Sequence, residues 1–229
     1  MSAFPSGPRL LRGAIACLER GKPLAKAIIF QYNPDRMTRS LIPRTFGSER
    51  DKNPRSQLDP GEANRLTGPP KETISLTIEI DATDQLEQAD NTAVTYGIHP
   101  QLAALEMLLY PTSNQVIANS KLSKTGSLEI VPMEAPFTLF VWGVQRILPI
   151  RLESMSVNEL AYDVNLNPIL AEVSLTMQIL SYVDLKPTHI GSAAFMAHQL
   201  QKQQMAALDT CNTVSSIGKS FKDRIQQFL

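Results

Sequence analysis

Two segments of the chain alternate between apolar and polar residues, as half-buried β-strands do. Every second side chain is apolar between residues 73 and 81, and again from Ile169 to Ile179 within residues 169–183. A period of two places successive side chains on opposite faces of a strand. We therefore predict two strands, each with one buried face and one face in water.

The second of these strands has a partner just before it in the sequence. Residues 150–162 also read as a strand, and residues 163–168 form a connector rich in Asp, Asn and Pro, which favour turns. At ~3.3 Å per residue, each strand is roughly 40 Å long. A two-stranded arm of that length exceeds what a small closed domain needs, and it suits lateral assembly.

Further apolar runs complete the predicted β body. Residues 10–33 contain two runs around an Arg-Gly-Lys-Pro stretch, which predicts a hairpin, although residues 10–18 also fit a short helix. Residues 98–110 have apolar side chains at spacings of three and four, which predicts a helix that packs on a sheet. Residues 128–131 and 137–144 read as strands, and the second is apolar on both faces, so we expect it to be central.

A long polar segment interrupts this pattern between residues 46 and 70. It is rich in Gly, Pro and Asn. The stretch from Arg36 to Lys71 contains eight basic and four acidic residues, which gives it a net charge of +4. The simplest interpretation is a solvated loop. The functional alternative is a contact arm whose cations meet an acidic surface on a neighbouring subunit, because complementary charges fix the register of two surfaces. The candidate contact residues are Arg50, Lys52, Arg55 and Arg65.

The end of the chain differs in composition from the rest. Residues 192–229 are rich in Ala, Gln, Lys and Met and contain no Pro. Their apolar positions fall at helical spacings of three and four, at Val214, Ile217, Phe221, Ile225 and Phe228. We therefore expect a β domain over residues 1–187 and an amphipathic helical extension over residues 188–229, outside that domain, whose stripe packs against a partner protein.

Charge and composition exclude several classes of protein. Lys and Arg balance Asp and Glu at 22 each, so the balance does not indicate a nucleic-acid binder. The two cysteines, Cys17 and Cys211, fit neither a disulfide framework nor a zinc motif. No stretch approaches the ~20 apolar residues that span a bilayer, and the N-terminus does not read as a signal peptide. We expect synthesis in the cytoplasm and no direct insertion into a membrane.

The residue types that perform catalysis are present but not in catalytic patterns. His99, His189 and His198 lack the spacing of metal-binding motifs, and we expect His99 to cap a helix or lie at the surface. The acidic run of Asp81, Asp84, Glu87 and Asp90 lacks the pattern of a calcium loop and better fits the start of a helix. No nucleophile, phosphate-loop or dinucleotide motif occurs. The sequence therefore predicts no enzyme activity, no catalytic or metal-binding residue and no cofactor.

Taken in order, several segments resemble the tube-like proteins of contractile injection systems, which are relatives of phage tails. They cover most of residues 10–185 and read FQYNPDRMTRSL (30–41), GPPKETISLTIEIDATDQLE (68–87), GIHPQLAALEMLLYP (97–111), PFTLFVWG (136–143) and LPIRLESMSVNELAYDVNLNPILAEVSLTMQILSYVDL (148–185). The resemblance implies a mainly β fold, an antiparallel sandwich or barrel with one packed helix, here followed by a C-terminal helical extension. Six copies close into a ring around a channel in this family.

Family members that carry this set of segments belong to the baseplate and continue the tube onto the spike hub. The resemblance therefore implies a tube initiator or adaptor with the inner tube protein, the spike hub and other baseplate proteins as partners, in a bacterial or archaeal particle that is released or membrane-anchored. No LysM-like stretch follows residue 185, so a contact through such a domain does not carry over. The alternative from another class is a monomeric module that binds a ligand such as a cell-wall glycan or cargo.

Overall fold

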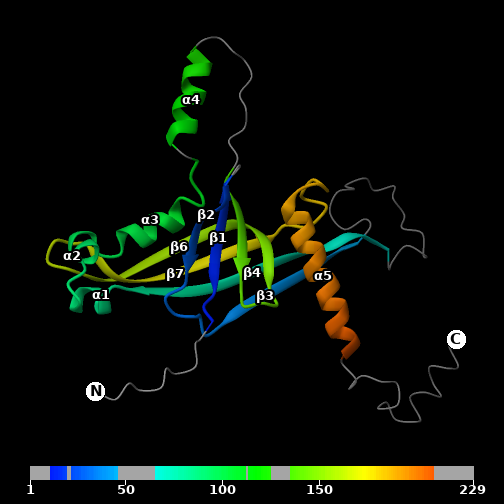
Figure 1. Cartoon of the computed structure of the whole chain (residues 1–229), viewed down its shortest axis with the longest axis horizontal. Helices are drawn as coiled ribbons and strands as arrows, with labels where there is room; N and C mark the ends of the chain where they lie inside the picture. Colours follow the sequence, from blue (N-terminus) through cyan, green and yellow to red (C-terminus); the bar gives the residue numbers. More distant parts are fainter. Residues whose placement is uncertain (1–10, 20–21, 46–64, 112, 125–134, 209–229) are drawn as a thin grey trace, which may run out of the picture.

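The fold is centred on one antiparallel sheet of seven strands (Figure 1). The computed structural model describes residues 11–19, 22–45, 65–111, 113–124 and 135–208. The strand order is β2-β1-β5-β6-β7-β4-β3. The strands are β1 (Ala14–Glu19), β2 (Lys22–Ile29), β3 (Met37–Thr45), β4 (Leu66–Asp81), β5 (Phe137–Val141), β6 (Ile147–Tyr162) and β7 (Pro168–Ile179).

Strand β6 divides the sheet into two parts. Residues 147–150 of β6 pair with β5, and residues 150–162 pair with β7. We call β3, β4, β7 and residues 150–162 of β6 the long layer, and β1, β2, β5 and the start of β6 the short layer. β1 and β2 run across the direction of the long strands (Figure 1). The sheet therefore curls, so that its inner face can surround a core.

Both layers contribute side chains to a single core. Ile15, Phe30 and Phe140 come from the short layer and the segment that follows it, and they belong to the same buried cluster as every second residue of β4 and β7. The buried residues of these two strands are Ile74, Leu76, Ile78, Ile80, Ala171, Val173, Leu175, Met177 and Ile179. Because burying one such large side chain stabilises the fold by ~1.5–3 kcal/mol, the alternating pattern supplies much of the driving force for folding.

Three short helices follow β4 and lie at one end of the long layer (Figure 1). They are α1 (Thr83–Glu87), α2 (Asn91–Tyr96) and α3 (His99–Glu106). Asp90 caps α2, because its carboxylate accepts hydrogen bonds from the backbone of Thr92 and Ala93. Gly97 ends α2 at φ +56°, and a Cβ there would lie 2.2 Å from the carbonyl oxygen of Pro168. Glycine is therefore required where the helices meet the β6–β7 turn.

The predicted mainly β, antiparallel fold with a packed helix and a C-terminal helix is confirmed, although the described strands form one curled sheet with two edges, β2 and β3. The hairpin prediction for residues 10–33 is correct, and the helical alternative for residues 10–18 is wrong. The helix predicted over 98–110 is α3, which buries Leu102 and Leu105 but ends at Glu106. The strand expected over residues 128–131 lies outside the described residues.

The prediction of a loop up to residue 70 is wrong at its end, because β4 already begins at Leu66. Pro69 and Pro70 had favoured a loop. Here they lie where β4 pairs with β3 but not yet with β7, since the β7 ladder begins at Thr73. The ladder with β3 also shifts its register between Ile42 and Arg44, opposite these prolines, and proline is tolerated at free edges and at such bulges. Residues 46–64 lie outside the described part of the chain.

Two helices differ from what the sequence predicted. Helix α4 (Ser113–Lys124) extends away from the sheet and was not predicted (Figure 1). Helix α5 (Ile190–Leu208) confirms a helix within residues 188–229. Its first half does not lie outside the β body, which corrects our expectation, because Phe195 belongs to the core cluster. Gly191 is also buried, and a Cβ there would lie 2.6 Å from atoms of Phe137 and Leu185.

Candidate assembly surfaces

The long layer has two edges at which strands lack a second partner among the described residues. β3 pairs only with β4, and beyond Ile150 β6 pairs only with β7. Each edge therefore presents a row of backbone N–H and C=O groups to its surroundings. Such edges pair readily with a strand of another chain. The layer has the order β3-β4-β7-β6, so its two edges are different strands.

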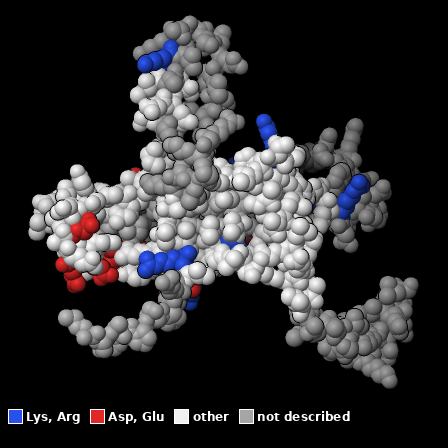
Figure 2. Space-filling model, in the orientation of Figure 1, with Lys and Arg blue, Asp and Glu red and all other residues white. Residues whose placement is uncertain are grey.

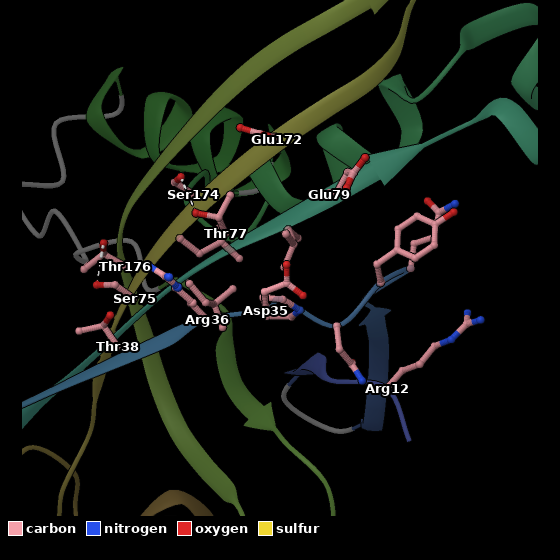
Figure 3. Close-up of a pocket in the computed structure, with 17 residues that line it drawn as sticks. Arg12, Asp35, Arg36, Thr38, Ser75, Thr77, Glu79, Glu172, Ser174 and Thr176 are labelled. Carbon is pink, nitrogen blue, oxygen red and sulfur yellow. Dashed lines mark hydrogen bonds between the residues drawn. The ribbon is translucent and has the colours of Figure 1, made fainter. Parts of the chain in front are cut away.

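The face of the long layer that points away from the core is polar. Ser75 lies opposite Thr176 and Thr77 lies opposite Ser174, with side-chain oxygens 3.5 and 3.0 Å apart. Glu79 lies directly opposite Glu172 in the same ladder. These side chains line a shallow groove together with the segment that enters β3, which carries Asp35 and Arg36 (Figure 3). Between β4 and β7 the face thus offers hydroxyl and carboxylate groups to whatever lies above it, and the exposed Tyr32 lines the same groove.

Two amide side chains of the FQYN segment hold the two layers together. Gln31 donates to the carbonyl of Asp81 at 2.8 Å and accepts from its backbone N–H at 3.0 Å. Asn33 accepts from the backbone of Gly13 at 2.9 Å and donates to the carbonyl of Leu11 at 2.8 Å. Both residues were part of the resemblance, but neither was predicted to have a role. Both have a structural role, because their side chains form hydrogen bonds with backbone groups that have no partner in a neighbouring strand.

One end of the molecule combines apolar side chains with acidic ones. We call it the acidic end, and it consists of α1, α2 and the β6–β7 turn, which meet where Ile98 N–H donates to Pro168 at 2.8 Å. Val164 is 99% exposed there, and Val94, Tyr96, Leu160 and Leu166 are also exposed. The exposed acidic residues are Asp84, Glu87, Asp90 and Glu159. Figure 2 shows acidic side chains gathered at this end.

The acidic end contains no cation because the segments that build it contain none. No Lys or Arg occurs in residues 72–120 or 152–185. The turn itself is ordered by Asp163, which accepts from the backbone of Asn165 and Asn167 at 2.7 and 2.8 Å. The side-chain hydrogen bond from Asn167 is the main cause that holds the pKa of Asp163 below its ordinary value. This carboxyl therefore stays ionised and adds to the negative charge of the end.

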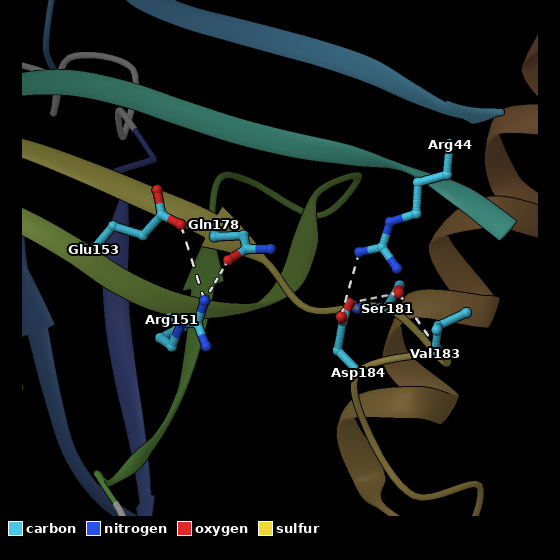
Figure 4. A network of polar contacts seen from close by, with 7 residues as sticks. All are labelled: Arg44, Arg151, Glu153, Gln178, Ser181, Val183 and Asp184. Atoms are coloured by element: carbon cyan, nitrogen blue, oxygen red, sulfur yellow. Dashed lines mark hydrogen bonds and ion pairs between the residues drawn. The ribbon is translucent and has the colours of Figure 1, made fainter. Parts of the chain in front are cut away.

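At the opposite end of the long layer, a polar network joins β3 to the segment between β7 and α5 (Figure 4). Asp184 accepts from the backbone and the hydroxyl of Ser181 at 3.0 and 2.6 Å, and from Arg44 at 3.3 Å. Burial acts to raise the pKa of Asp184, but the hydrogen bonds from Ser181 and Arg44 lower it more, so it lies below its ordinary value. The network fixes the chain where it leaves the sheet for α5.

Helix α5 itself is anchored over the sheet by a charged cluster. Glu72, a buried residue of β4, forms ion pairs with Arg39 of β3 and with Lys202 of α5, the latter at 3.3 Å. His198 lies one turn before Lys202 and is buried, and neither of its ring nitrogens has a hydrogen-bond partner among the described residues. This cluster could not be predicted from the sequence, because its members come from three distant segments.

The predicted contact residues fall mostly outside the described chain. Arg65 is described, and it lies exposed immediately before β4. Arg50, Lys52 and Arg55 of the loop lie in residues 46–64, and Val214, Ile217, Phe221 and Ile225 of the tail lie in residues 209–229, both outside the described residues. Their roles stay predictions. His99 is exposed at the first position of α3 and does not cap it through its side chain.

The described residues bring together no set of groups with an evident catalytic or metal-binding arrangement. Among them, no three His, Cys, Asp or Glu side chains are grouped as a metal ion would require. The described helices also include none that is long and apolar enough to cross a membrane. The features that the described residues do present are the two strand edges, the polar face and the acidic end.

Comparisons with known proteins give a distant likeness to solved structures. No family model matches the chain, and no curated protein matches it. Among solved structures, one similar chain comes from the tail of an empty GTA particle, determined with C6 symmetry. It is 13% identical, the match covers 73% of this chain and 90% of that one, and the TM-score is 0.27. A likeness of this degree does not assign this chain to a family.

Proposed function

We propose that this chain is a structural ring subunit of a contractile injection system, which joins the inner tube to the baseplate and spike hub as a tube initiator or adaptor. The resemblance of residues 10–185 to tube-like proteins supports the class of machine. The proposed role is one of assembly and not of catalysis.

The observation that carries the proposal is the pair of different free edges on the long layer. If β3 of one copy pairs with β6 of the next, the contact is heterologous, and each copy still has one free edge of each kind. Such contacts close into a ring or continue as an open filament. Six copies are what the resemblance implies, and they would close four strands each into a continuous barrel.

The polar outer face fits the same arrangement. The core occupies the inner face of the long layer, so closure of the ring would turn the face with Ser75, Thr77, Ser174 and Thr176 toward a water-filled channel. Hydroxyl groups that already pair across the strands need little further solvation there. The curl of the sheet would then place the short layer and the helices on the outside of the ring.

Pairs of proline variants at the β6 edge test the proposed ring contact. Of two neighbouring residues in an antiparallel strand, one directs its N–H to the paired strand and the other directs it outward. We expect Val157→Pro and Asn158→Pro to differ in whether they fold and in whether they form rings. The variant at the outward position should fold but fail to form rings, because proline is tolerated only where no ladder bond is lost.

Native mass spectrometry and electron microscopy supply the measurement. The parent chain should form six-fold rings in the assembled particle, at the junction between tube and baseplate. Another symmetry at that junction would contradict the proposal. A chain that stays monomeric with its tube and hub partners present would favour a monomeric module that binds a glycan or cargo.

A further inference from the structure

We propose that the C-terminal segment of one copy, residues 214–228, docks as an amphipathic helix on the acidic end of a second copy. The inference rests on the proposed self-assembly and names a contact within it. Three observations support it, and they concern the patch, the segment and the distance between them.

The patch is apolar, and exposed carboxylates lie at the same end of the molecule (Figure 2). Val94 and Tyr96 of α2 and Val164 and Leu166 of the β6–β7 turn are each at least half exposed. α2 and this turn contact each other, because the Asn167 side chain donates to the carbonyl of Thr95 at 3.4 Å. Exposed apolar side chains gathered in this way usually mark a surface that binds another protein. The carboxylates at this end favour a partner that bears cations.

The C-terminal segment has the complementary pattern. On a helix with 100° between residues, Val214, Ile217, Phe221, Ile225 and Phe228 form one stripe. Lys222 and Arg224 then fall on the two sides of that stripe, whereas Lys219 falls on the opposite face. A helix that lays its stripe on the patch would bring a flanking cation close to the carboxylates at this end. An amphipathic helix that lays its apolar face on a partner is a recurring mode of recognition.

The segment cannot reach the acidic end of its own chain. Lys202 of α5 contacts Glu72, which precedes Asp81 at the acidic end by nine residues of β4, or roughly 30 Å. Beyond Lys202, α5 runs away from α1 and α2 (Figure 1). The link from Leu208 at the end of α5 to Val214 at the start of the stripe spans at most about 22 Å when fully extended. The occupant must therefore come from a second copy.

Zero-length coupling between chains of different isotopic mass tests the contact directly. Equal amounts of unlabelled and 15N-labelled full-length chain are mixed and treated with a carbodiimide, which joins a lysine amine to a carboxylate that touches it. We expect bonds from Lys222 to Asp84, Glu87 or Asp90, and many of them should join a labelled chain to an unlabelled one. Bonds only between chains of the same mass, or no bonds at these positions, would overturn the inference.

Paired variants show whether the stripe and the patch supply the binding energy. Phe221→Ser should weaken the association of copies roughly 10- to 100-fold, because it removes a large apolar side chain from the contact. Lys219→Ser is its control and should have no effect. On the patch, Val164→Ser should weaken the association, whereas Val144→Ser, which changes a valine that is 79% exposed in the β5–β6 turn, should not. Equal effects within either pair would count against the contact.

The same samples separate this inference from the proposed function. Rings of six without mixed-isotope bonds would refute the tail contact and leave the ring intact. Mixed-isotope bonds without six-fold rings would support the tail contact and refute the ring symmetry. The absence of both would refute both.

Discussion

Lys202 on α5 donates a hydrogen bond of 3.3 Å to Oε2 of Glu72, a residue of β4 that is 3% exposed. The other carboxylate oxygen of Glu72 accepts from Arg39 on β3. One buried carboxylate therefore connects two strands to the C-terminal helix. Because the helix has few other polar contacts with the sheet among the described residues, this carboxylate is central to how α5 is held.

The first prediction compares the two partners of this ion pair. Lys202→Gln should lower the free energy of unfolding by at most about 1 kcal/mol, because the lysine is 41% exposed and Arg39 still pairs with Glu72. Glu72→Gln should cost about 1.5–3 kcal/mol, because the charged acceptor of the hydrogen bonds from both Arg39 and Lys202 is lost. Urea denaturation measures both. Equal costs would show that Glu72 does not have this central role.

The second prediction concerns pH and His198. Burial lowers the pKa of His198, Lys202 lowers it further, and Glu72 acts in the opposite direction. The unfolded chain then binds a proton at a higher pH than the folded chain, so stability is lost as the pH falls below about 6.5, the ordinary value for histidine. Asp163 and Asp184, whose pKa values are lowered, lose their contribution only at more acidic pH, below about 4.

Thermal unfolding between pH 5 and pH 8 separates these contributions. His198→Leu should remove the loss of stability that begins near pH 6.5, and it should not destabilise the protein at pH 8, because it replaces two unpaired buried nitrogens with carbon. His99→Leu is the control, since that histidine is exposed. An unchanged pH dependence in His198→Leu would contradict the assignment.

Strand periodicity predicted the body of this fold because each long strand buries one face. The alternation in β4 and β7 corresponds to their buried and exposed residues almost position by position. The start of β4 was missed because Pro69 and Pro70 usually exclude a strand. They are accepted here because β7 does not reach this part of β4 and because the ladder with β3 shifts its register at these two residues. Both are properties of the strand pairing, which the local sequence does not contain.

The candidate surfaces were less predictable than the strands. The free edge of β6 depends on where β5 stops pairing, and the Glu72 cluster depends on contacts between segments more than 100 residues apart. The acidic run was correctly assigned to helix starts, since Asp90 caps α2. That it lies beside Val164 and Leu166 follows only from the packing of α2 against the turn, so the patch could not be read from either segment.

The third prediction tests the two hydrogen bonds between the Gln31 side chain and the backbone of Asp81. Gln31→Leu should lower the free energy of unfolding by about 1–3 kcal/mol, because it leaves the backbone N–H and C=O of Asp81 without a partner at a half-buried position. Tyr32→Ser is the matched control and should have little effect, since that side chain is exposed. Hydrogen exchange at Asp81 should also accelerate in the Gln31 variant. Protection that stays unchanged would show that the amide does not hold this part of β4.

The last prediction uses the two carboxylates on the polar face of the long layer. Glu79 and Glu172 lie directly opposite each other, and like charges in that position destabilise a strand pair. Glu172→Lys should therefore raise the free energy of unfolding by about 0.2–1 kcal/mol. Glu79→Lys should act likewise, whereas the double variant restores two like charges and should lose the gain in stability.

Salt should stabilise the parent slightly and the single variants not at all, because it screens repulsion between the two side chains in the parent and attraction between them in the single variants. A double-mutant cycle in urea at low and high salt measures this coupling. If the two substitutions are additive at low salt, the carboxylates do not interact, and the pair exerts no measurable strain on the face that we propose lines the channel.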